Sequence, residues 1–387
     1  MGYSGLLEWV KFNNPMDNAY YPYDVYNLPY DAGAKLWELL GGLLGWLINL
    51  LVPGNRLSTW LISDAVVNAF AIIFLAVILF AVGFVVNLTM IWEERKVLGR
   101  MMDRRGTKIG PLGYFQCLGD GLKTFMKENV APADKDKKIY WWALSLVIGS
   151  SVLIACMVPL SHRWFVVDYS TGLLLIFGIF ALAPFFILCA GWAQNNKYSL
   201  LGGIRAATLM ISYEIPMLIL LASVVLMAGS FNINDIVNAQ FDTMWYIVPQ
   251  FIGFIVFVVC AIAESERVPF DLAEAEAELV EGWQTEYAGM KWGLIMLGDY
   301  FRGYTACALI VILYLGGWML PGIGATAVPE LVFLLKIFAV FFIFIWARAS
   351  LPRVRIDQIL NIGWKRLMPL SVVNLCIVLL LKMGGVF

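Results

Sequence analysis

The chain has 387 residues, of which 61% are hydrophobic and 14% are charged, whereas an ordinary soluble domain has about 25% charged residues. Its 27 basic and 28 acidic residues leave a formal net charge of -1, which excludes a general electrostatic attraction to nucleic acid. An aromatic content of 14% excludes a disordered chain. A single histidine, His162, argues against haem or zinc chemistry in the chain. Together these values indicate a polytopic membrane protein.

Residues 1–64 are interpreted as an N-terminal extension. An apolar run at 36–52 follows a Tyr- and Pro-rich stretch, and Glu38 and Asn49 interrupt it. Because a bilayer core takes about 20 apolar residues, we expect an interfacial or partly inserted helix here rather than a ninth span. The segment has no basic n-region or small-residue cleavage site, so a signal peptide is not expected.

The remainder of the chain, 65–387, is expected to be one all-α membrane domain. Its apolar runs are continuous and do not alternate with a period of two, which favours helices over a β-barrel. Eight of these runs are long enough to predict transmembrane helices, at about 65–91, 141–160, 171–191, 206–229, 245–263, 293–318, 330–349 and 367–386.

Basic residues gather in alternate loops, which predicts the orientation of the chain. Segment 93–140 holds eleven of the 27 Lys and Arg residues, whereas 230–244 and 319–329 hold none. By the positive-inside rule, the large loops are cytoplasmic, and the start of the first span and the C-terminus lie outside. We therefore expect a multi-pass protein of the cell (inner or plasma) membrane.

Charged residues inside the predicted spans need a reason, because each costs roughly 2.5–3.5 kcal/mol at the bilayer centre on the most lenient scale. Glu214 lies within Ile-Ser-Tyr-Glu-Ile-Pro at 211–216 with no basic residue nearby, which favours a functional role. Asp299 and Arg302 lie three apart and can pair on one helix face. Lys336 is expected to bind an acidic residue of a partner or to snorkel.

The cytoplasmic segment 264–286 is the densest charged feature, with eight of the 28 acidic residues and one base, Arg267. Its spacing predicts a helix from Asp271 onward that places several carboxylates on one face. The carboxylates concerned are Asp271, Glu274, Glu278 and Glu281. Where hydration is poor, like charges raise one another's pKa, so the segment could carry protons near neutral pH. The alternative is a solvated acidic helix.

The first cytoplasmic segment shows a different pattern. Leu118, Leu122, Phe125 and Met126 form one apolar stripe, which predicts an amphipathic helix that lies on the membrane surface or docks a soluble partner. The six cysteines show no Cys-x-x-Cys spacing, so we expect buried apolar thiols rather than an iron–sulfur cluster. His162 is expected to be solvated in an outer loop.

Five groups of segments resemble the H (or subunit 1) family of membrane subunits of respiratory complex I, the NADH:quinone oxidoreductase of the NDH-1 type. The longest matches are Asn-Asn-Lys-Tyr-Ser-Leu-Leu-Gly-Gly-Ile-Arg-Ala-Ala at 195–207 and Glu-x-x-Arg-x-Pro-Phe-Asp-Leu-x-Glu-Ala-Glu-x-Glu-Leu-Val at 264–280. The other matching segments are 94–98, 120–128, 211–216, 285–291, 348–358 and 363–365.

The resemblance implies a subunit of a proton-translocating quinone oxidoreductase that docks a hydrophilic redox arm and lines a quinone tunnel. The proton-relay residues that it implies are Glu214, Glu264, Asp271, Glu274, Glu276, Glu278 and Glu286. The tunnel residues that it implies are Arg95, Arg100, Arg104 and Arg267. No cofactor or metal is expected in this chain. Quinone is the expected substrate, and FMN and iron–sulfur clusters are expected in partner subunits, beside other membrane-arm subunits and the lipid bilayer.

The chain departs from the family pattern at some positions. Asp103 stands where Gln is usual, Thr107-Lys108 where Pro-Asn is usual, and Ser265-Glu266 where Thr-Asn is common. Two alternative functions remain open at this point. The first is the membrane anchor of a related energy-converting hydrogenase or formate hydrogenlyase, which has no quinone site. The second is a stand-alone ion transporter, although no inverted repeat is visible.

Overall fold

The computed structural model describes residues 35–36, 64–162, 164–166, 168–272, 276–320 and 328–384. This part of the chain contains helices and one isolated β-bridge, between Ser161 and Trp164. The all-α prediction is therefore confirmed. The expected helix at 36–52, and with it most of the N-terminal extension, lies outside the described residues.

The helices run in chain order as follows: α4 Asp64–Met101, η1 Pro111–Gly113, α5 Phe115–Met126, α6 Lys137–Met157, α7 Gly172–Phe180, α8 Ala183–Ala193, α9 Lys197–Ala228, α10 Ile233–Asp242, α11 Phe251–Glu264, α12 Glu276–Leu279, η2 Gly282–Gln284, α13 Met290–Tyr314, α14 Pro329–Ser350, α15 Ile356–Ile362, η3 Gly363–Leu367 and α16 Met368–Met383. The prediction of an amphipathic helix in the first cytoplasmic segment corresponds to α5, on which Leu122, Phe125 and Met126 are exposed.

Seven of the eight expected spans coincide with helices that are long and apolar enough to cross a membrane. The exception is 245–263, which contains α11. This apolar helix has 14 residues, or about 21 Å at 1.5 Å per residue, against a bilayer core of about 30 Å. A hydrogen-bonded turn from Tyr246 to Gln250 precedes α11 and lengthens the segment. The polytopic membrane fold is confirmed, with seven long helices and one shorter apolar helix.

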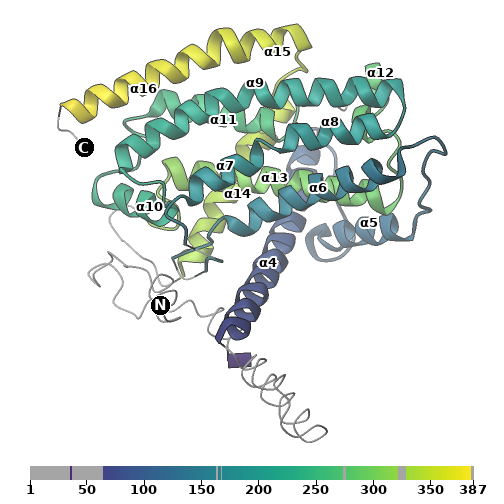
Figure 1. Ribbon diagram of the computed structural model, residues 1–387, viewed down its shortest axis with the longest axis horizontal. Coiled ribbons are helices and arrows are strands. Elements are labelled where there is room, and N and C mark those ends of the chain that lie inside the picture. Colours follow the sequence, from purple (N-terminus) through teal and green to yellow (C-terminus); the bar gives the residue numbers. More distant parts are fainter. Residues whose placement is uncertain are drawn as a thin grey trace, which may run out of the picture.

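Helix α13 forms the centre of the bundle (Figure 1), where it packs against α4, α6, α11 and α14. Every residue from 301 to 314 is buried, as expected for a helix that is apolar on nearly all sides. Helix α4 stands at a steep angle to the bundle, and α5 lies beside its C-terminal end (Figure 1). The C-terminal helices α15 to α16 follow one edge, where α16 packs against α9.

Local signals explain the ends of the longest central helix, α9. The Asn196 side chain accepts a hydrogen bond from the Tyr198 N–H at its start, which is the usual role of an N-cap. At its end Gly229 has a φ of 75° and donates its N–H to the Val225 carbonyl, as glycine commonly does at helix ends. Within α9, Gly202 lies directly against Gly282, where an added Cβ would come within 2.5 Å of backbone. This close approach fixes the loop that follows α12.

One sequence expectation is wrong in the membrane domain, that for His162, and Lys336 makes contacts that the sequence did not indicate. Lys336 Nζ donates to three carbonyls just beyond α13, those of Leu315 at 2.7 Å, Gly317 at 2.9 Å and Met319 at 2.6 Å. An acidic residue of a partner or snorkelling at Lys336 stays a prediction. His162 is 3% exposed rather than solvated, since its loop folds back through the bridge at Ser161.

The expectation for the cysteines holds only in part. Cys117, Cys260 and Cys307 are buried, and Cys156 and Cys189 are half-buried, whereas Cys376 on α16 is exposed. All six are free thiols in the structure. The exposed one lies on an apolar helix at the edge of the bundle, so spacing and composition do not distinguish it from the buried ones.

Candidate functional site

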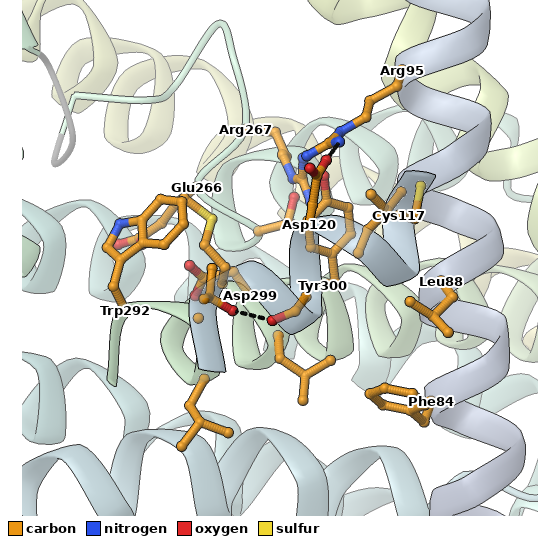
Figure 2. A pocket seen from close by; sticks show the side chains of 18 of the residues that line it. Phe84, Leu88, Arg95, Cys117, Asp120, Glu266, Arg267, Trp292, Asp299 and Tyr300 are labelled. Carbon is orange, nitrogen blue, oxygen red and sulfur yellow. Dashed lines mark hydrogen bonds and ion pairs between the residues drawn. The ribbon is translucent and has the colours of Figure 1, made fainter. Parts of the chain in front are cut away.

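A cavity of about 400 Å³ lies between α4, α5, α13 and the loop that follows α11 (Figure 2). Helix α4 contributes Phe84, Leu88, Ile91 and Arg95, whose three- and four-residue spacing places them on one helix face. Helix α5 contributes Asp120 and its neighbours on the opposite wall. The charged prolongation of the first span and the amphipathic helix therefore face each other across one space.

The cavity is amphipathic. Figure 2 shows Phe84 and Leu88 at one end, and Arg95 and Arg267 toward the other. Arg95 pairs with Asp120 across the gap between α4 and α5. Such a shape, with an apolar wall and a few convergent polar groups, is typical of a small-molecule site.

Close contact between α5 and α13 closes the side of the cavity. Gly293 on α13 lies against Thr124, and a Cβ at this glycine would come within 2.9 Å of the Thr124 hydroxyl. Cys117 lines the cavity and is 5% exposed. Burial raises the pKa of its thiol, so the thiol is neutral at neutral pH.

Glu94 is the centre of a dense charged cluster at the polar end. It accepts two hydrogen bonds from Arg267 Nη1, at 2.9 and 2.7 Å, and one from the Tyr300 hydroxyl at 2.9 Å. Arg348 also donates to Glu94, and the Arg267 guanidinium lies 4.2 Å from the centre of the Tyr300 ring. Glu94 is 4% exposed. Two cations thus surround one buried carboxylate, and we call these four residues the Glu94 cluster.

A second cavity, of about 450 Å³, adjoins the first one at this cluster. Arg95, Tyr300 and Arg348 line both cavities, while Arg104 and Arg105 line only the second. The polar end is therefore rich in arginines, which favours a ligand with oxygen acceptors at its head.

A second charged group lies farther along the cavity wall and consists of Glu266, Asp299 and Arg302, which we call the Arg302 triad. Arg302 donates to Asp299, confirming the pair expected from their spacing, and its Nη2 lies 4.0 Å from Glu266 Oε2. Glu266 and Asp299 line the cavity. Burial raises the pKa of Glu266, and the nearby Arg302 only partly offsets this effect.

Glu264 and Glu214 continue the line of acidic residues into the bundle. Glu264 is 3% exposed, and its Oε2 accepts no hydrogen bond from the described part of the chain. Glu214 Oε1 is likewise without a hydrogen bond there. The two helices that carry them, α11 and α9, pack together, and the two carboxyl groups are close enough to interact electrostatically.

The structure does not bring all the expected relay residues together. Asp271 lines the cavity and binds Arg353 at 2.9 Å. Glu278 pairs with Arg205 at the surface, where its side chain is 58% exposed. Glu286 lies elsewhere and accepts from Asn196 at 2.9 Å. Glu274 and the side chain of Glu276 lie outside the described residues.

The predicted one-faced helix of carboxylates is wrong. Helix α12 has only four residues, Glu276–Leu279, and Val280 has a φ of 65°, which ends the helix before Glu281. Asp271 precedes α12 and belongs to no helix. The close fit of Gly202 on Gly282 holds the chain in a turn here, a tertiary contact that overrides the helical spacing.

The four predicted tunnel arginines fall into three groups. Arg95 and Arg267 line the first cavity, and Arg104 lines the second. Arg100 is exposed, and it lines neither of these two cavities in the described part of the chain. The sequence interpretation did not assign Glu94, Arg348 or Tyr300 to the site, because their contacts join segments more than 170 residues apart. It did not assign Glu266 either, because the placement of this residue depends on the conformation of the loop after α11.

Two comparisons with known proteins bear on this geometry. The family model described as NADH dehydrogenase matches residues 72–379. The chain is 44% identical to the H subunit of NADH-quinone oxidoreductase from Paramagnetospirillum magneticum over 283 residues, which is 72% of this chain and 83% of that protein. It is 42% identical to the protein of the same name from Bacillus cytotoxicus over 320 residues, 81% of this chain and 95% of that protein.

A third relative, the protein of the same name from Rhodospirillum rubrum, is 40% identical over 303 residues, 77% of this chain and 89% of that protein. The matched residues include α4 from residue 72 onward, the helices from α5 to α14 and both walls of the cavity. The resemblance first seen in the loop motifs is thereby confirmed, and the chain belongs to the NADH dehydrogenase family, among the H subunits of respiratory complex I.

Proposed function

We propose that this integral membrane protein forms the membrane end of a quinone access tunnel and starts the proton-coupling relay of an NADH-quinone oxidoreductase. The observation that carries the proposal is the cavity between α4, α5 and α13, which is apolar along α4 and rich in arginines at its other end. A quinone has the matching chemistry, with an isoprenoid tail and two carbonyl oxygens that accept hydrogen bonds.

The tunnel residues in this proposal follow from the two adjoining cavities. Arg95 and Arg267 border the first, and Arg104 borders the second. Donors from guanidinium groups suit the quinone carbonyls, because charge-assisted hydrogen bonds are the stronger ones. Arg100 is exposed, so its role would lie at the junction with a partner subunit.

The proton relay in this proposal runs from the cavity wall to Glu264 and Glu214. Asp271 lies on the cavity wall, and Glu264 is buried and interacts electrostatically with Glu214 and Glu266. Carboxyl groups without hydrogen-bond partners in a poorly hydrated interior can change protonation when a nearby charge changes. Glu274, Glu276, Glu278 and Glu286 belong to the same loop, and we include them as the cytoplasmic proton supply.

The partners follow from the chemistry that the chain lacks. Quinone reduction needs electrons, which FMN and iron–sulfur clusters of hydrophilic partner subunits would deliver at the arginine-rich cavity. The loops that carry these arginines are cytoplasmic by the charge rule, and the C-terminus lies outside. Other membrane-arm subunits would receive the proton signal from Glu214.

The tunnel is tested by filling it. Leu88 lines the cavity (Figure 2), so Leu88→Trp should lower quinone reductase activity of the assembled complex at least about tenfold. Reduction of a water-soluble artificial acceptor, which draws electrons before the quinone, should be unchanged. Leu380→Trp on α16 is the matched control, because Leu380 is 70% exposed at the edge of the bundle. Unchanged quinone reduction in the assembled Leu88→Trp complex would contradict the tunnel.

A further inference from the structure

The Arg302 triad holds hydrogen-bonding groups that are close together but unused. Arg302 Nη2 is bonded to Asp299, whereas Glu266 Oε2 lies 4.0 Å away. Neither oxygen of Glu266, and neither Nε nor Nη1 of Arg302, has a hydrogen-bond partner among the described residues. A buried polar group without a hydrogen-bond partner is unfavourable. A short movement of the guanidinium would therefore exchange one carboxylate partner for the other.

The charge count of the triad requires one proton. Glu266, Asp299 and Arg302 are 6%, 9% and 3% exposed. With both carboxylates ionised the triad carries a net charge of -1, which a buried site disfavours. One proton makes it neutral, and the carboxyl group that lacks the guanidinium is the one that holds the proton. In the structure this group is Glu266.

The backbone supports a specific placement of Glu266. Its φ of 50° lies in the left-handed region, which is strained for a residue other than glycine. Its N–H bonds to the Ala263 carbonyl at 3.1 Å, so the chain leaves α11 in a tight turn directly after Glu264. The turn places a carboxyl group beside Arg302 at a position where the backbone alone would favour glycine.

We propose that Glu266 and Arg302 are relay residues, and that one proton crosses between Glu266 and Asp299 while Arg302 moves to the carboxylate that the proton leaves. This inference rests on the proposed function. The O–H bond of Glu266 breaks and an O–H bond forms on Asp299, while the guanidinium exchanges Asp299 for Glu266. The triad is neutral before and after the step, so no uncompensated charge is buried.

The triad lies between the buried glutamates and the Glu94 cluster, so a movement of Arg302 can affect both. On one side, Glu264 precedes Glu266 by two residues and interacts electrostatically with Arg302. On the other side, Tyr300 follows Asp299 and donates to Glu94. Asp271, from the loop before α12, and Glu264 are further acidic groups that interact electrostatically with Glu266. The triad thus joins the buried glutamates to the cavity and to the Glu94 cluster.

Infrared difference spectroscopy of the whole complex tests the shared proton. The wild-type complex should show a protonated carboxyl band from the triad that shifts when quinone is reduced. Glu266→Gln and Asp299→Asn should each remove this band, because Arg302 then forms a neutral pair with the remaining carboxylate. A band that persists in either variant would overturn the shared proton.

Activity tests the relay role. Arg302→Gln and Glu266→Gln should each lower quinone reduction coupled to proton translocation at least about tenfold, without changing reduction of an artificial acceptor. Glu266→Gln keeps the Arg302–Asp299 pair and so remains informative if Arg302→Gln does not assemble. Arg366→Gln, the same change at an exposed residue of η3, is the matched control and should behave as wild type.

Glu214→Gln separates this inference from the proposed function. If Glu214→Gln is inactive in proton translocation while Glu266→Gln turns over normally, the relay exists but does not use the triad, and only this inference is overturned. If Glu214→Gln also turns over normally, the relay of the proposed function is itself wrong. Loss of coupled activity in both variants, together with loss of the infrared band, supports the triad.

Discussion

The Glu94 cluster and the Glu214–Glu264 pair are both acidic, with Glu94 and Glu264 buried and Glu214 half-buried. They differ in how far their charges are matched. Glu94 accepts hydrogen bonds from Arg267, Arg348 and Tyr300. Glu214 and Glu264 each keep a carboxyl oxygen without a hydrogen bond to the described chain. A fully paired carboxylate is held in one ionised state, whereas an unpaired one can gain or lose a proton. The first region therefore fixes the shape of the cavity, and the second can carry the signal.

The largest effect is expected from neutralising the paired region. Glu94→Gln leaves the guanidinium groups of Arg267 and Arg348 without their carboxylate, and an uncompensated buried charge costs about 3–5 kcal/mol. The midpoint of thermal unfolding of the purified complex should fall clearly. Glu128→Gln, at an exposed residue beyond α5, controls for the substitution itself. An unchanged midpoint in Glu94→Gln would contradict the claim that the ion pairs of Glu94 stabilise this region.

A smaller effect is expected when the cluster loses only one neutral donor. Tyr300→Phe removes the 2.9 Å hydrogen bond to Glu94 but keeps the ring against Arg267. A hydrogen bond to a charged group contributes about 1.5–3 kcal/mol, so the variant should unfold between the wild type and Glu94→Gln. A midpoint as low as that of Glu94→Gln would show that the hydroxyl, rather than the ion pairs, holds the cluster.

The pH dependence of the unfolding midpoint tests whether a buried carboxyl group without a hydrogen bond holds a proton. Burial raises the pKa of Glu266 from 4.5 to about 7, so between these pH values the folded state holds a proton that the unfolded state has released. Stability should then fall as pH rises through this window, by up to about 1.4 kcal/mol per pH unit. Glu266→Gln should have a flatter profile of unfolding midpoint against pH. Parallel profiles for the two proteins would contradict a protonated Glu266.

The smallest effect is expected at the surface pair of the acidic loop. Arg205→Gln breaks the contact with Glu278, whose side chain is 58% exposed. Exposed ion pairs contribute about 0.2–1 kcal/mol and weaken in salt, so the unfolding midpoint should change little and less still at high ionic strength. A large loss of stability would show that this pair is buried by a partner subunit in the assembled complex.

The sequence predicted the membrane fold well, because runs of apolar residues are a local property. Seven expected spans coincide with long helices, and the short α11 differs because a turn rather than a regular helix precedes its N-terminus. The spacing of Asp299 and Arg302 also predicted their pairing. Both predictions use residues that are close to one another in the sequence.

The candidate site was less predictable, because it depends on contacts between distant segments. Glu94 meets Arg348 across 254 positions of the chain, and no local spacing indicates such a contact. Helical spacing failed between Asp271 and Glu281, where the backbone packing of Gly202 on Gly282 dictates a turn. A left-handed residue such as Glu266 also has no local signal, since glycine is the residue that this conformation favours.

The central claim is that a carboxyl group with a buried, unpaired oxygen carries the proton signal, and Glu214→Gln tests it most directly. The substitution is nearly isosteric and removes no hydrogen bond from Glu214 Oε1. The assembled complex should keep its unfolding midpoint and its reduction of an artificial acceptor, but lose quinone reductase activity and proton translocation. Normal coupled turnover in this variant would contradict the account.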